Sequence, residues 1–136
     1  MSFEIYVQSF ENGQRFGLPL EEVFQSFGEY ATKVSPTQWK VYYDSRNNCD
    51  IYVGNTLNAS QITSLTIHRP CGDARLWNSL FEIMGFGHVA LYFPESQILL
   101  RDEGSATHLP KDMVNALKGY KVIQHVDQIL NEISTV

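Results

Sequence analysis

Reactive side chains are concentrated between positions 68 and 75, in a turn that joins a predicted strand to a predicted helix. They are His68, Arg69, Cys71, Asp73 and Arg75. A thiol near a helix N-terminus and beside cationic groups ionises more readily, which favours the nucleophilic thiolate. His68 could then act as the base, while Arg69 or Arg75 held an anionic substrate. The turn therefore supports one hypothesis, a small cysteine-dependent enzyme.

The same turn also has a structural interpretation, which we favour. Asp73 directly precedes the first expected helical residue, where a carboxylate accepts a backbone N–H and acts as an N-cap. Cys71 is then a small apolar turn residue, and the arginines pair with surface acids. No Asn or Asp is visibly placed in the sequence to orient His68. We therefore expect no catalytic residue here and keep the enzyme as the alternative.

The spacing of the histidines and cysteines gives little support for a metal site or a disulfide. The four histidines show neither an i, i+4 pair on a helix nor an H-x-H pair. A further alternative is a metal or small-ligand site between two duplicated halves, with His68 and His88 approaching beside carboxylates. Cys49 and Cys71 match no metal motif, and two thiols in a chain without a secretory signal are usually free. We expect no cofactor and no bound metal.

Length, charge and hydropathy narrow the class of protein. A chain of 136 residues with 43% hydrophobic residues has the size and apolar content of one domain, covering 1–136. Its apolar runs are far shorter than the roughly 20 residues that span a bilayer. The start, MSFEIYVQ, lacks a signal peptide's basic and apolar regions. The net charge of −5 without a basic run argues against nucleic-acid binding. We expect a cytoplasmic protein.

Hydrophobic periodicity predicts an α+β fold. Alternation of apolar and polar residues predicts strands at 3–8, 39–43, 51–53, 62–68, 89–93, 98–100 and 120–123. Apolar residues at helical spacing predict helices at 19–28, 74–84, 110–118 and 126–133. Breaks are expected at 35–37 and 54–60. Because strand, helix and hairpin occur in this order at 3–53 and again at 63–101, we predict one mainly antiparallel sheet with three or four helices packed on it, built from two similar units.

A surface of acids and aromatics is the best candidate for a binding site. The alternation places Tyr6, Tyr42, Tyr52 and Tyr92 opposite the apolar side of their strands. Tyrosine gives a large contact area at low entropic cost, although cross-strand packing alone also explains such residues. The predicted partner-binding residues are Glu4, Tyr6, Tyr42, Asp44, Asp50 and Tyr52. An acidic, aromatic surface would suit a basic protein partner.

Two stretches carry a resemblance to known proteins. FEIYVQSFENG and LTIHRPCGDARLWNSLFEIM resemble segments of small, stand-alone bacterial proteins of unassigned function. In size, acidity and lack of a catalytic signature, the chain is also similar to immunity proteins of contact-dependent inhibition and other polymorphic toxin systems. That resemblance implies a cytoplasmic protein that covers a toxin's active site or locks it closed. It implies no particular oligomeric state and assigns no individual residue.

Overall fold

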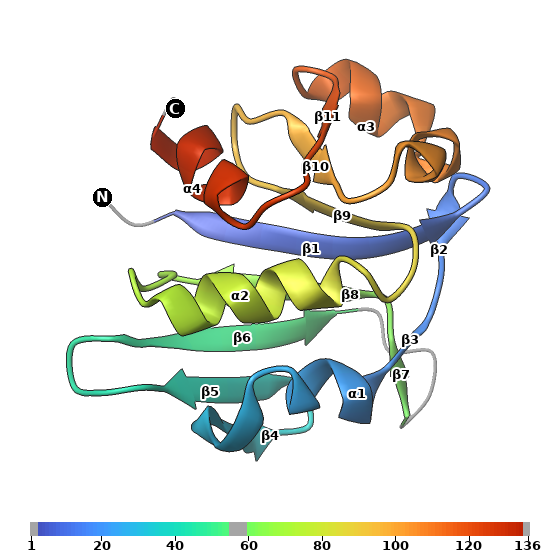
Figure 1. The fold of residues 1–136 in the computed structure, drawn as a ribbon. Helices are drawn as coiled ribbons and strands as arrows, with labels where there is room; N and C mark the ends of the chain where they lie inside the picture. Colours follow the sequence, from blue (N-terminus) through green and yellow to red (C-terminus); the bar gives the residue numbers. More distant parts are fainter. Residues whose placement is uncertain (1–2, 55–59, 135–136) are drawn as a thin grey trace.

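A nine-stranded sheet forms the centre of the computed structural model, which describes residues 3–54 and 60–134 (Figure 1). The strands are β1 (Glu4–Glu11), β2 (Gln14–Arg15), β3 (Leu18–Pro19), β4 (Ala31–Ser35), β5 (Gln38–Tyr42), β6 (Asn48–Gly54), β7 (Gln61–Ile62), β8 (Ser64–His68), β9 (Val89–Tyr92), β10 (Ile98–Leu100) and β11 (Tyr120–Val122). The sheet order is β11-β10-β9-β1-β8-β6-β5-β4, with β2 paired to β1. Strands β3 and β7 form a separate pair. All these pairs are antiparallel except β10 with β11.

Local sequence explains where the helices begin and end. The helices are α1 (Leu20–Gln25), α2 (Ala74–Ile83), α3 (Lys111–Ala116) and α4 (Asp127–Ser134), with short 3-10 helices η1 (Gly28–Tyr30) and η2 (Glu103–His108). The Asp73 carboxylate accepts the Arg75 backbone N–H, which confirms the predicted N-cap of α2. Pro19 precedes α1, whose first turn carries Glu21 and Glu22, favourable for the helix dipole. After α1, Gly28 adopts a φ of +64°, where glycine carries no Cβ penalty.

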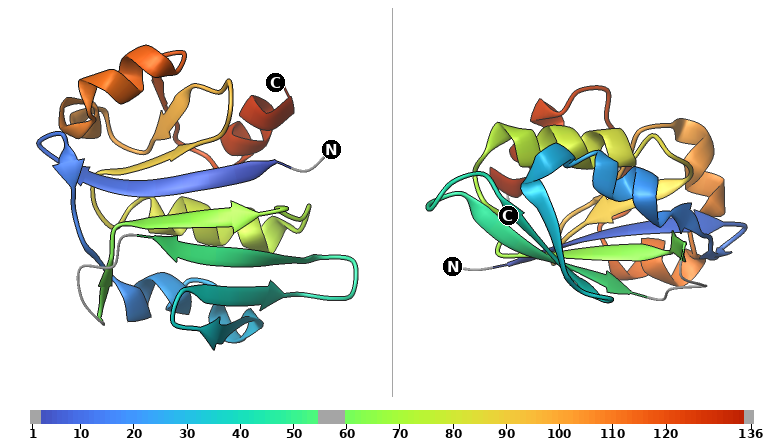
Figure 2. Two further views of the ribbon diagram at one scale, coloured as in Figure 1. Left: turned by 180° about the vertical axis from the view of Figure 1, so that it is seen from behind. Right: turned by 90° about the horizontal axis from the view of Figure 1, so that it is seen from below.

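Two hydrophobic cores lie on opposite sides of the sheet. The larger contains inward-facing strand residues and apolar residues of α1, α2 and α4, including Val23, Leu80 and Ile129. The smaller contains Phe10 and Ala90, packed with η2, α3 and their flanking residues. Figure 2 shows α1 and α2 together on one side of the sheet. The sheet is therefore covered along one side, but on the other side only towards the β9–β11 end.

The hairpin of each half of the chain pairs with the central strand of the other half. Strands β1 and β8 are antiparallel neighbours at the centre of the sheet. The hairpin β5–β6, from the first half, pairs with β8 from the second half. Strands β9 and β10, from the second half, extend the sheet from β1. Each half therefore completes its hydrogen bonding with strands of the other.

The structure confirms the α+β class and the mainly antiparallel sheet, and it differs from the sequence-based prediction in three details. The edge strand β4 covers residues 31–34, which were unassigned from the sequence, and residue 35, which was predicted to lie in a break. The apolar spacing that predicts this helix would also bury Phe81, but Phe81 is partly exposed beneath the Arg101 guanidinium, which lies 4.1 Å from its ring centroid. The last strand joins the sheet in parallel. The predicted loop at 54–60 lies mostly outside the described residues.

Candidate protein-binding face

The side of β1, β5, β6 and β8 that points away from α1 and α2 is here called the outer face. It carries polar and aromatic side chains in alternation with the buried ones: Glu4, Tyr6, Gln8, Gln38, Lys40, Tyr42, Asn48, Asp50, Tyr52, Ser64, Thr66 and His68. Seen from behind, no helix formed by the described residues lies in front of these four strands (Figure 2, left). Tyr42 and Tyr52 are 51% and 41% exposed. The outer face is thus an open, mixed polar and aromatic surface.

A row of charged groups crosses the outer face. The register places Lys40 opposite Asp50, Asp50 opposite His68, and His68 opposite Glu4. Lys40 Nζ lies 3.7 Å from Asp50 Oδ1, and His68 Nδ1 lies 3.4 Å from Glu4 Oε1. Exposed pairs of this kind contribute only about 0–1 kcal/mol to stability. Their main effect is to orient two carboxylates that remain accessible.

A row of aromatic groups runs beside the charged one. Tyr6 is opposite Tyr92, and their rings stack with centroids 5.3 Å apart. The Tyr6 hydroxyl donates to Glu4 Oε2 at 3.2 Å, while the Tyr92 hydroxyl donates to Gln8 Oε1 at 2.9 Å. Burial and the adjacent Glu4 carboxylate raise the pKa of Tyr6, so its hydroxyl stays a donor. The ring of Tyr52 meets His68 edge-on at 6.1 Å.

The predicted binding residues are brought together with one exception. Glu4, Tyr6, Tyr42, Asp50 and Tyr52 all lie on the outer face. The exception, Asp44, sits in the turn between β5 and β6, where its carboxylate accepts the backbone N–H groups of residues 46 and 47 at 2.8 Å. The side-chain hydrogen bond from residue 47, with these backbone bonds, lowers the Asp44 pKa. Asp44 thus shapes a turn at the rim of the face.

Sequence reasoning missed Lys40, Gln8 and the role of His68 in the charged row. Their side of the sheet could be predicted from the alternation, because Lys40 and Gln8 lie two residues from Tyr42 and Tyr6, and His68 follows the apolar Ile67. Their neighbours on adjacent strands could not be predicted, because the strand order was unknown.

At one end of the outer face lies a hollow of about 230 Å³, lined by Phe3, Glu4, Tyr6, His68 and Pro94.

The proposed cysteine enzyme is not assembled by the fold. His68 lies on the outer face against Glu4, whereas Cys71 packs on the larger core on the helix side, next to Cys49. Arg69 is exposed in the turn, with a φ of +54°. The residues proposed as base and nucleophile therefore belong to different sides of the sheet.

Arg75 is held by its neighbours and is poorly placed to receive a substrate. Its Nε and Nη2 donate to Asp73 at 2.9 and 2.8 Å, and its Nη1 donates to the Tyr30 hydroxyl at 3.0 Å. The guanidinium also lies 4.8 and 4.7 Å from the ring centroids of Tyr30 and Tyr43. These contacts lower the pKa of Asp73 to about 2 and raise that of Arg75. The pair supports the start of α2.

The histidines do not lie where the metal hypothesis requires them. His88 stacks on His108, with ring centroids 3.7 Å apart, and its Nδ1 lies 3.0 Å from Ser105 Oγ. His68 is opposite Glu4 at the start of β1, while the His88 carbonyl accepts from Phe10 near the other end. Six residues of strand separate these positions by roughly 20 Å. The alternative in which His68 approaches His88 is therefore wrong. Within residues 3–54 and 60–134, no three His, Cys, Asp or Glu side chains form a metal-binding group.

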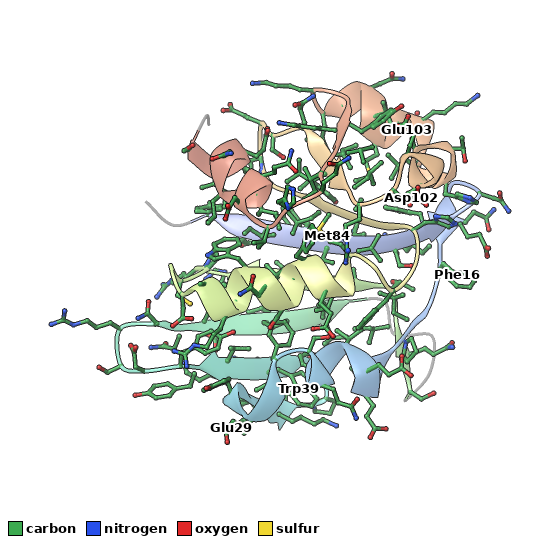
Figure 3. The ribbon with its side chains drawn as sticks, viewed as in Figure 1. Phe16, Glu29, Trp39, Met84, Asp102 and Glu103 are labelled. Carbon is green, nitrogen blue, oxygen red and sulfur yellow. The ribbon has the colours of Figure 1, made fainter. Side chains whose placement is uncertain are left out.

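A larger hollow of about 540 Å³ lies beside α1 and the edge strand β4. Its lining is Pro19, Leu20, Glu21, Glu22, Lys33, Trp39, Ser60 and Gln61. Trp39 stacks on Phe24 of α1 with centroids 3.9 Å apart, and Figure 3 shows it next to that helix. This hollow could not be predicted from the sequence, because its walls come from distant segments. Its described lining includes neither histidine nor cysteine and mixes both signs of charge, so we assign it no chemistry.

Comparison with known proteins identified no relative of the chain. No family model, curated protein or solved structure matches the chain. Among the helices formed by the described residues, none has the length and apolar character needed to span a bilayer. What the outer face can do therefore follows from its own residues.

Proposed function

We propose that this chain is a non-enzymatic protein-binding domain whose outer face binds a basic protein partner. The observation that carries the proposal is an uncovered four-strand surface on which exposed tyrosines lie beside accessible carboxylates. Tyrosine is enriched at protein interfaces, because its ring supplies apolar area and its hydroxyl a hydrogen bond.

The shape of the outer face favours a macromolecule over a small ligand. Its hollow of about 230 Å³ is smaller than the roughly 300–1,000 Å³ of most small-molecule pockets. Four strands and about six residues give a surface of roughly 20 Å by 20 Å. A stable protein interface buries about 800 Å² on each partner, so the partner must also contact the rims. One rim is the β5–β6 turn that carries Asp44.

Contacts within the outer face prepare it for binding. Glu4 is held by Tyr6 and His68, and Asp50 by Lys40 and Gln38. Side chains that are already ordered lose less conformational entropy when a partner docks. A basic partner would replace these weak exposed pairs with charge-assisted hydrogen bonds in a drier environment.

The biological setting that we propose is toxin neutralisation in a bacterial cytoplasm. An immunity protein must recognise one partner tightly and needs no chemistry of its own. An acidic, aromatic face would meet a basic toxin domain such as a nuclease through complementary charge, which mainly speeds association and selects the partner. A toxin gene adjacent to the coding region would support this setting, whereas a metabolic operon would argue against it.

Charge reversal on the outer face tests the proposal. We expect Asp44→Lys/Asp50→Lys to weaken capture of a basic partner at least tenfold and to reduce the salt dependence of binding, since two attractive charges become repulsive. The measurement is affinity capture from a lysate of the source organism, identification of the captured protein, and titration of that purified partner at several salt concentrations.

The matched control is Glu29→Lys/Glu82→Lys, which makes the same change in net charge. Glu29 belongs to η1 and lies near α1, away from the outer face (Figure 3), and Glu82 belongs to α2. The control should retain wild-type affinity. Equal loss in both variants would show that only net charge matters. Undiminished binding by the outer-face variant would refute the assignment of the site.

A further inference from the structure

Two cysteines that are distant in the sequence meet on the helix side of the sheet. Cys49 is an inward-facing residue of β6 and is 3% exposed. Cys71 lies in the turn between β8 and α2, is partly exposed, and packs on the same core. Asp50 lies opposite His68, so Cys49 and the turn that follows His68 lie at the same end of β6 and β8. Both thiols are free. The fold therefore brings one sheltered and one accessible thiol to the same part of the larger core.

The surroundings of the pair distinguish the two sulfur atoms. Burial, together with the nearby Cys71, raises the pKa of the Cys49 thiol to about 12, so it stays protonated near neutral pH. Tyr43 lies beside both thiols, and its hydroxyl is buried without a hydrogen-bond partner among the described residues. A reagent from solvent would therefore reach Cys71 first, with Cys49 positioned behind it.

We propose that Cys49 and Cys71 form an oxidation site that closes to an intramolecular disulfide when a hydroperoxide reaches Cys71. The Cys71 thiolate attacks one peroxide oxygen, an S–O bond forms, and the O–O bond breaks with release of hydroxide. The Cys49 sulfur then attacks the Cys71 sulfur, gives up its proton, and displaces the hydroxyl group as water. Two thiols lose two electrons, and one hydrogen peroxide is reduced to two waters.

The disulfide would join the centre of the sheet to the start of α2. It would tie β6 to the turn that carries Asp73 and Arg75. A cross-link between positions 49 and 71 removes conformations from the unfolded chain and thereby stabilises the fold. For a closed loop of this length we expect the melting temperature to rise by roughly 10 °C.

Peroxide treatment of the full chain under native conditions tests the inference. We expect the intact mass to fall by two hydrogen atoms, both thiols to become unreactive to alkylation after unfolding, and peptide mapping to join positions 49 and 71. The protein should remain uncross-linked to other chains, and dithiothreitol should reverse the change together with the rise in melting temperature.

Single variants identify the order of events. In Cys49→Ser, peroxide should leave a sulfenic acid at Cys71 that dimedone traps, since no resolving thiol remains. In Cys71→Ser, Cys49 should stay unmodified, because it is buried. If either variant fails to fold, peptide mapping of the wild type still decides. Progression of Cys71 to sulfinic acid with Cys49 left as a thiol, or cross-links between chains, would overturn the proposal.

Discussion

The Asp73 side chain makes a contribution to folding stability that depends on pH. Its pKa is about 2 in the folded protein and about 3.9 in an unfolded chain. As the pH falls, the unfolded chain therefore takes up the proton first. The stability that Asp73 contributes is complete above about pH 4 and is lost as the pH falls through about 2. The cause is the guanidinium of Arg75, which favours the charged carboxylate.

Replacing Asp73 should therefore have a pH-dependent effect. We expect Asp73→Ala to lower the urea midpoint clearly at neutral pH and much less near pH 2, where about half of wild-type Asp73 is itself protonated. Asp73→Asn keeps an acceptor for the helix N-cap but loses the charge, so its midpoint at neutral pH should lie between those of the other two proteins. A gap between Asp73→Ala and wild type that is the same at both pH values would contradict this account.

Ile67 tests the centre of the larger core. It lies between Ile5 on β1 and Ile51 on β6, and all three are 0% exposed. We expect Ile67→Ala to lower the free energy of unfolding by about 2–5 kcal/mol, because the removed atoms leave a cavity between tightly packed strands. The control is Val34→Ala on the edge strand, which is 58% exposed and should change stability by less than about 0.5 kcal/mol. Urea denaturation of both variants checks the contrast.

At the scale of elements, the backbone conformation at some turns restricts which residue can occupy them. Gly28 follows α1 with a φ of +64°, whereas Gly72, in the turn before α2, lacks a positive φ, and an added Cβ would meet nothing within 4 Å. We expect Gly28→Ala to destabilise the protein by about 1–2 kcal/mol, because alanine is strained in the left-handed region. Gly72→Ala should be neutral or slightly stabilising. Thermal melts of the two variants distinguish them, and equal effects would rule out backbone strain as the cause.

Elements with a clear hydrophobic period could be predicted from the sequence, and those without one could not. Helix α2 followed from its apolar spacing and from Asp73, and β6 from the alternation that buries Ile51 and Val53. Strand β4 was missed because its three central residues are all exposed, so no alternation marks it. The same alternation placed Glu4, Tyr6 and Tyr52 on the outer face. The proximity of Cys49 and Cys71 could not be predicted, since periodicity does not give the neighbours of a strand.

At the scale of the molecule, the exchange of hairpins makes the halves depend on each other. The first half contributes β1, β5 and β6, but β1 pairs with β8 and β9 from the second half. Unpaired backbone groups and exposed apolar faces would remain if either half folded alone. The duplicated order of elements was readable from the sequence, whereas the exchange was not, because it depends on long-range register.

Splitting the chain checks this dependence. We expect fragments 1–60 and 61–136 to be largely unfolded when separate, by circular dichroism and proteolysis, and to regain sheet structure when mixed. A permuted chain that keeps both halves covalently linked, with the break placed at the same point, is the control for cutting the backbone and should fold. A stable first fragment on its own would show that the halves are independent.

The position of β1 also bears on synthesis of the chain. Strand β1 precedes both of its partners along the chain, since β8 ends at His68 and β9 at Tyr92, so these partners emerge much later. At about 5–20 residues per second, the ribosome needs on the order of ten seconds to complete them. During that interval Ile5 and Val7, both buried in the finished fold, have no neighbouring strand to cover them. The nascent protein should therefore be a client for a chaperone that shields apolar segments until the centre of the sheet can close.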